Sequence, residues 1–153
     1  MLGLLFPAVI DNRFRGQQLG YWLLAPVLFI KIGIALGSIL TPARANKADA
    51  IDLSSYSPAA LHDAMTSTAL LGLMHLVIGL FCVLMMIRYR ALVPLIYFWL
   101  LTEFLGRRVV LGLYPMERVE GPSSGSIINL ALLTVMVVGC ALALWPRRQV
   151  ETS

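Results

Sequence analysis

Four long apolar runs, separated by short polar segments, constrain this chain more than any other feature of its sequence. They cover residues 19–40, 59–87, 91–113 and 126–145. Each exceeds about 18 residues, and at a rise of about 1.5 Å per residue such a helix crosses a hydrocarbon core about 30 Å thick. A segment inside a bilayer must satisfy its backbone polar groups internally, which a helix does. We therefore predict an all-α integral membrane protein whose single domain, residues 1–153, is an up-down bundle of four transmembrane helices.

The composition agrees with a membrane location and argues against a nucleic-acid partner. Hydrophobic residues make up 59% of the chain and charged residues 13%, with a mean hydropathy of +0.82. A soluble domain is about 45–50% apolar and about 25% charged. The net charge of +4 comes from basic residues near the ends of the runs, and no basic stretch alternates with aromatic residues. We interpret this charge as a determinant of membrane topology.

The basic residues between the runs predict the orientation of the bundle. Six lie on the side of the two termini: Arg13, Arg15, Arg88, Arg90, Arg147 and Arg148. Three lie on the opposite side: Arg44, Lys47 and Arg118. Because cytoplasmic loops carry the excess of Lys and Arg, we expect both termini in the cytoplasm. If Arg107 and Arg108 also reach the outer surface, the count becomes six basic residues on the side of the termini against five on the opposite side.

The segment before the first run lacks the order of a cleaved signal peptide. Its apolar residues precede its charges, Pro7 interrupts them, and no small-residue cleavage site follows. We expect residues 1–18 to form a short interfacial segment. The outline of four spans in a chain of this size resembles DoxX-type and other small bacterial inner-membrane families. This resemblance is one of architecture, and with it we expect a multi-pass protein of the bacterial inner (plasma) membrane.

Ionisable residues in the middle of three runs are the main candidates for function. Lys31, His75 and Glu103 fall near the centres of the first three runs, and Arg107 follows Glu103 by one helical turn. A charge at this depth costs about 2.5–3.5 kcal/mol on insertion scales, so such groups normally face protein and have a partner. Glu103 and Arg107 have the i, i+4 spacing of an intrahelical ion pair. We expect a buried cluster in which Arg107, together with Lys31 or His75, compensates Glu103.

Small residues predict which helix faces pack against protein. In the second run Gly72 and Gly79 share one face with His75, and the opposite face is uniformly bulky and apolar. In the first run Gly33 and Gly37 form a small-xxx-small pair, which lets helix backbones approach closely. We expect this pair to contact another helix of the bundle or a second copy of the chain.

Three functional hypotheses follow, and the sequence does not exclude any of them. The leading one is a non-enzymatic accessory, assembly or interaction subunit, in a homodimer or a larger membrane complex, whose cluster fixes helix register. The second is a small carrier or binder of an amphipathic anion or of protons, with Lys31 and Arg107 as counter-charges. The third is a membrane redox, pigment-binding or lipid-modifying protein with His75 and Glu103 as an acid–base pair.

The sequence assigns no catalytic residue, metal site or resident cofactor. His75, between two glycines, would suit a haem or chlorophyll-type ligand, but His62 lies about 140° round the helix and cannot act as a second axial ligand. We expect a packed, hydrogen-bonded histidine, with a single-histidine pigment site as the alternative. The acidic residues of the loops show no recurring metal-ligand spacing, and no phosphate-binding loop or hydrolase motif is present.

Overall fold

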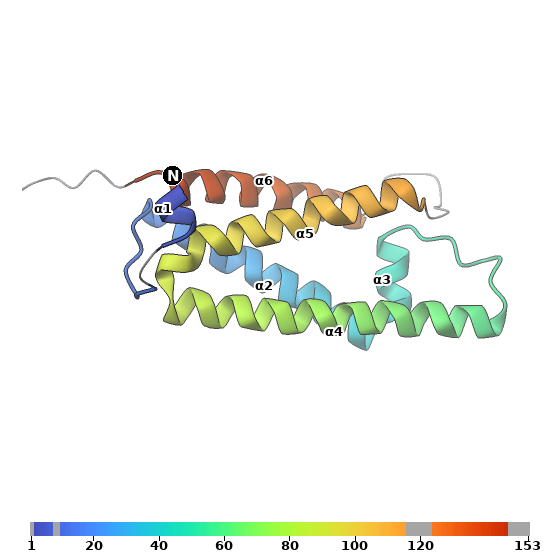
Figure 1. The fold of residues 1–153 in the computed structure, drawn as a ribbon. Helices are drawn as coiled ribbons and strands as arrows, with labels where there is room; N and C mark the ends of the chain where they lie inside the picture. Colours follow the sequence, from blue (N-terminus) through green and yellow to red (C-terminus); the bar gives the residue numbers. More distant parts are fainter. Residues whose placement is uncertain (1, 8–9, 116–123, 147–153) are drawn as a thin grey trace, which may run out of the picture.

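The computed structural model describes residues 2–7, 10–115 and 124–146, and within these ranges the chain is helical, without any strand. Four long helices, two short ones and a 3₁₀ turn follow one another along the chain (Figure 1): α1 (Leu2–Leu5), α2 (Gln18–Leu40), α3 (Pro42–Ala48), α4 (Pro58–Arg88), η1 (Arg90–Leu92), α5 (Val93–Leu113) and α6 (Ser124–Leu144). One long helix covers each of the predicted runs, so the all-α prediction is confirmed. The predicted interfacial position of residues 1–18 remains a prediction, and residues 1, 8 and 9 lie outside the described ranges.

Three of the described helices are long and apolar enough to cross a membrane. They are α2, α4 and the part of α6 from Gly125 to Leu144. Helix α5 has 21 residues but carries Glu103, Arg107 and Arg108 within its length, so its composition alone does not mark it as a span. The described chain accordingly has three candidate membrane-spanning helices by length and composition.

Local chemistry explains where the helices begin. Ser57 caps α4, accepting a hydrogen bond from the backbone N–H of Ala60 at 3.3 Å, and Pro58 stands at the first position, where its missing N–H costs nothing. Helix α5 likewise has Pro94 in its first turn. These helix starts agree with the starts predicted from the sequence, because each depends only on residues next to it in the chain.

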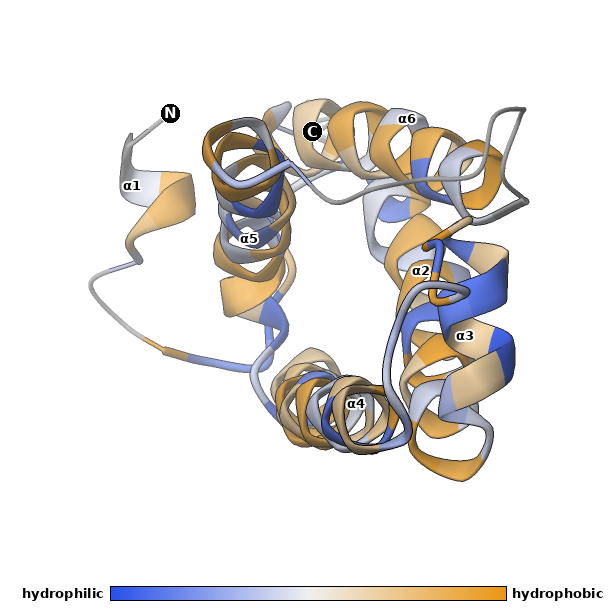
Figure 2. Ribbon diagram, turned by 90° about the vertical axis from the view of Figure 1, so that its right-hand side faces the viewer, coloured by the Kyte–Doolittle hydropathy of each residue, from blue (hydrophilic) through white to orange (hydrophobic). Residues whose placement is uncertain are grey.

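The four long helices form a bundle in which α2 packs against α4 and α6, and α5 packs against α6. Figure 2 looks along this bundle. It shows α4 next to α2 and below α5, on the side of the bundle away from α6. The segment before α2 meets the end of α6: the N–H of Gln17 donates to the carbonyl of Leu142 at 3.1 Å, and Gly16 pairs with Pro146. Helix α3 lies at the other end of the bundle (Figure 1). We call these the terminal end and the α3 end.

The buried core lies where α2, α5 and α6 meet, nearer the terminal end. Its largest fully buried side chain is Tyr97 of α5, whose hydroxyl donates a hydrogen bond to the carbonyl of Gly20 at 2.8 Å. Gly139 of α6 faces the same ring, and a side chain added there would collide with it. Gly139 of α6 therefore makes room for one tyrosine, which ties α5 to α2 and α6, while Gly20 lets α2 approach the backbone of α6.

The two faces of α4 differ as expected for a helix between protein and lipid. Gly72, Gly79 and Cys82 are buried, while Leu70 and Val77 on the opposite face are 59% and 57% exposed. Thr68, on the packing face near the α3 end, donates a hydrogen bond to the buried Asn46 of α3 at 2.8 Å. The packed face of α4 thus orients His75 toward the interior of the bundle.

Candidate functional site

Three ionisable side chains from three helices meet in the middle of the bundle. The ammonium group of Lys31 on α2 donates to Oε2 of Glu103 on α5, with a separation of 2.5 Å. The Nε2 atom of His75 on α4 lies 3.2 Å from Oε1 of the same carboxylate. These side chains are 17–26% exposed. We call Lys31, His75 and Glu103 the carboxylate triad.

Each oxygen of the Glu103 carboxylate has one nitrogen neighbour, and the two neighbours come from different helices. The triad therefore joins α5 to α2 and to α4, including across the side where α4 and α5 face one another (Figure 2). A lysine and a glutamate in direct contact form a neutral pair, which lowers the cost of placing either charge in a hydrocarbon core. This arrangement fixes the rotation of three helices.

The expected pair between Glu103 and Arg107 does not form. Arg107 instead makes an ion pair with Asp49, at the end of α3, with 3.3 Å between Nη2 and Oδ2. The reason is position along the bundle: Arg107 is one turn nearer the α3 end, where Asp49 lies, whereas Lys31 and His75 reach Glu103. The interhelical contact prevails over the intrahelical spacing.

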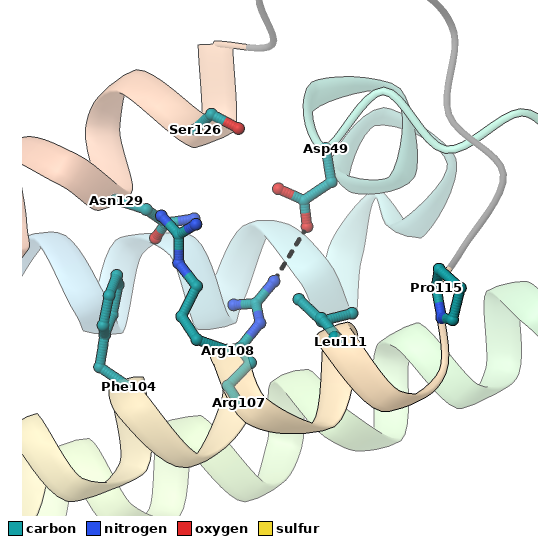
Figure 3. Close-up of a pocket in the computed structure, with 9 residues that line it drawn as sticks. Asp49, Phe104, Arg107, Arg108, Leu111, Pro115, Ser126 and Asn129 are labelled. Atoms are coloured by element: carbon teal, nitrogen blue, oxygen red, sulfur yellow. Dashed lines mark hydrogen bonds and ion pairs between the residues drawn. The ribbon is translucent and has the colours of Figure 1, made fainter.

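A pocket of about 440 Å³ opens at the α3 end, between α5, α6 and the residue that ends α3. Figure 3 shows Arg107 directed toward Asp49, and Arg108 directed toward Asn129 of α6. The Arg108 guanidinium also lies over the Phe104 ring, with 5.5 Å from Cζ to the ring centroid. We call this the arginine pocket.

The charges of the described residues around the arginine pocket do not balance. Among the described residues that line it, two guanidinium groups stand against the carboxylate of Asp49. Arg108 forms no ion pair with any carboxylate of the described residues. Asn129 and Ser126 add polar groups on one wall, whereas Phe104 and Leu111 provide apolar surface on another. A cavity with excess positive charge and one apolar wall suits a ligand with an anionic group and an apolar body.

The four glycines singled out by their spacing have different surroundings. A side chain added at Gly72 would lie 2.8 Å from Cβ of Ser38, and one at Gly79 would lie 3.0 Å from Cγ1 of Ile32. Both therefore let α4 approach α2 closely. Gly33 and Gly37 have no atom of the described chain within 4 Å of such a position. Within one chain they make no close helix contact, and their contact with a second copy remains a prediction.

The surroundings of His75 do not fit a planar pigment. The space beside Gly72 and Gly79 is filled by residues of α2, and Nε2 of His75 is directed at Glu103. His62 lies exposed in the second turn of α4. Within the described ranges no group of three or more His, Cys, Asp or Glu residues is close enough to hold a metal ion.

Sequence reasoning did not identify the arginine pocket. The sequence pattern placed Arg107 in the cluster with Glu103, and it gave no role to the acidic residues of the loops, of which Asp49 is one. The available signal was the pair of adjacent arginines, Arg107 and Arg108, inside an apolar run. Such a pair predicts a polar environment, but it does not identify the other residues that form that environment. Asp49, 58 positions away from Arg107, and Asn129 enter the site only through the packing of α3 and α6 around α5.

No family model matches the chain, and no curated protein or solved structure is significantly similar to it.

Proposed function

We propose that this protein is a four-span membrane protein that binds an amphipathic anion in the arginine pocket. The observation that carries the proposal is the lining of the pocket, in which Arg107 and Arg108 face one carboxylate among the described residues and an apolar wall adjoins them. An arginine guanidinium offers a planar set of donors that matches carboxylate and phosphate oxygens in pairs. The headgroup of the ligand would lie between the two arginines, with its apolar part along Phe104 and Leu111.

The fourth span of the proposal is α5. Its 21 residues correspond to about 31 Å at about 1.5 Å per residue, enough to cross a hydrocarbon core. Two of its three charges have partners: Glu103 contacts Lys31, and Arg107 contacts Asp49. Arg108 follows Glu103 by about 7.5 Å along the helix, from which a long side chain can extend toward an interface.

The proposed orientation has both termini in the cytoplasm and the arginine pocket at the outer side. An even number of spans requires both termini on one side, and the start of α2 and the end of α6 lie at the same end of the bundle (Figure 1). The excess of arginines near that end favours the cytoplasm. We place the protein in a bacterial inner membrane, and this location rests on the resemblance of architecture alone.

The carboxylate triad has a supporting role in this proposal. By joining α5 to α2 and α4 it sets the rotation of α5, and with it the direction in which Arg107 and Arg108 point. The triad itself is close to neutral when Lys31 and Glu103 are both charged, and both oxygens of Glu103 already have nitrogen neighbours. Ligand charge is therefore recognised one turn away, in the arginine pocket.

Binding of dodecyl phosphate to the protein purified in a neutral maltoside detergent tests the proposal. Isothermal titration calorimetry should show saturable binding, and Arg108→Gln should weaken it about tenfold or more, as loss of a charge-assisted hydrogen bond predicts. Arg88→Gln, an exposed arginine at the terminal end, is the matched control and should leave affinity unchanged. Absence of binding by the unaltered protein, or equal affinities of the two variants, would refute the proposal.

The accessory-subunit hypothesis has one specific observation in its favour, the open space beside Gly33 and Gly37. A second copy or another membrane protein would cover this face. Purification in mild detergent, followed by measurement of the mass of the particle, distinguishes a solitary binder from a subunit. Gly33→Ile should dissociate a dimer that depends on this face, without altering anion binding.

A further inference from the structure

Asp49 occupies the position in the arginine pocket that an anionic group of a ligand would take. Its carboxylate points into the pocket toward Arg107 (Figure 3) and accepts a hydrogen bond from that guanidinium at 3.3 Å. On its other side Oδ1 faces the first turn of α6, where Gly125 leaves room for it and a larger residue would collide with it. The fold thus supplies its own anion to one of the two arginines.

The contact between Asp49 and Arg107 is suited to being broken. The two side chains are 37% and 42% exposed, so water can solvate either group after separation. Ion pairs with this degree of exposure contribute about 0–1 kcal/mol. Asp49 also ends a short helix, followed by Ala50 in the left-handed region with φ 55°, so its carboxylate is carried by a connecting segment and not by a long helix.

We propose that Asp49 is a displaceable internal counter-ion and that the ligand carries a phosphate monoester as its headgroup. This inference rests on the proposed function and specifies its ligand. Counted over the described lining residues, the pocket has one guanidinium in excess with Asp49 in place and two with Asp49 displaced. A phosphate monoester carries about −1.5 to −2 charges at pH 7, which matches two guanidinium groups, whereas a carboxylate matches only one.

The apolar wall indicates how the rest of such a ligand would lie. Phe104 and Leu111 line the pocket beside the arginines, and both belong to the helix that we propose as the fourth span. A phosphate ester with an alkyl or acyl chain would place its headgroup at the α3 end and its chain along α5. A soluble phosphate ester would bind through the same headgroup but would make no contact with the apolar wall.

The test compares dodecyl phosphate with laurate, which has an alkyl chain of similar length but a single negative charge, on the full chain in neutral detergent at pH 7.5. Asp49→Asn should tighten binding of dodecyl phosphate up to about fivefold, since it removes a competing charge of the strength seen in partly exposed pairs. Asp63→Asn, an exposed residue of α4 toward the α3 end, removes the same charge outside the pocket and should change affinity much less. Thermal melting of both variants verifies that they fold.

Several outcomes would overturn the inference. If Asp49→Asn weakens binding or leaves it unchanged in a folded protein, Asp49 positions Arg107 and does not compete with the ligand. If Asp63→Asn tightens binding equally, the effect is one of general charge. If laurate binds as tightly as dodecyl phosphate, the headgroup is not a dianion. In each case binding by the unaltered protein and its loss in Arg108→Gln would still support the proposed function.

Inorganic phosphate distinguishes the two sources of the headgroup. Displacement of dodecyl phosphate by millimolar inorganic phosphate would indicate a soluble phosphate ester. Binding that resists inorganic phosphate, together with binding to neutral vesicles only when they contain phosphatidic acid, would indicate a lipid. Failure of the protein to bind any of these probes would overturn both the inference and the proposed function.

Discussion

Lys31 of α2 donates a hydrogen bond to Glu103 of α5 across 72 positions of the chain. The same carboxylate has His75 of α4 as its second neighbour. One acidic residue in the middle of an apolar helix is thereby neutralised by groups from two other helices. This contact explains how α5 can hold a carboxylate at mid-length and still pack as a helix of the bundle.

Separating the partners of this pair should be more harmful than removing both. Glu103→Leu leaves the Lys31 ammonium without its carboxylate, and we expect a loss of about 2 kcal/mol, less than the about 3–5 kcal/mol typical of fully buried pairs because the site is partly exposed. Glu103→Leu combined with Lys31→Leu should recover much of this loss. Thermal melting and reversible unfolding in detergent measure both. A double variant no more stable than the single one would contradict the assignment of the pair.

The contact between His75 and Glu103 should depend on a single N–H group. His75→Gln places an amide nitrogen near the position of Nε2 and should retain most of the thermal stability. His75→Leu removes the polar contact and should lower the free energy of unfolding by about 1 kcal/mol, the net contribution of one hydrogen bond. If both substitutions have the same effect on the melting temperature, His75 contributes through its volume and not through its nitrogen.

Glycines of the bundle should differ sharply in their tolerance of a methyl group. Gly139→Ala would bring a Cβ atom into the ring and hydroxyl of Tyr97, so we expect a loss of about 1–3 kcal/mol from overpacking. Gly33→Ala meets nothing within 4 Å and should be neutral or slightly stabilising, because alanine favours the helix more than glycine does. Melting temperatures in detergent compare the two. Equal losses would show that the packing of α5 against α6 is incorrectly described.

The orientation is testable with reporters at the two ends of the bundle. A reporter active only in the cytoplasm should be active when fused after Ser153 and inactive when inserted near Asp49. This follows from the excess of arginines at the terminal end and from an even number of spans. The reverse pattern would place the arginine pocket on the cytoplasmic side. A cytoplasmic signal at both positions would show that an even number of the three helices between them, α4, α5 and α6, cross the membrane.

The sequence by itself determined the helices and the packing face of α4. The apolar runs predicted the helical segments to within a few residues, Ser57 and Pro58 marked the start of α4, and the face of Gly72 and Gly79 proved to be the buried one. These features depend on the length of a run, the residues at its ends and the helical period, all of which are local. The membrane class follows from the same apolar runs.

Only the tertiary structure decided which charged groups meet. The spacing of Glu103 and Arg107 indicated a pair, but Glu103 contacts Lys31 and His75, and Arg107 contacts Asp49. Several donors lay within reach of one carboxylate, and the choice depends on the rotation and offset of each helix against its neighbours. Those quantities come from packing contacts such as that of Tyr97 with Gly20 and Gly139, which join residues far apart in the chain. No local pattern encodes them, and the arginine pocket, built from α3, α5 and α6, has the same origin.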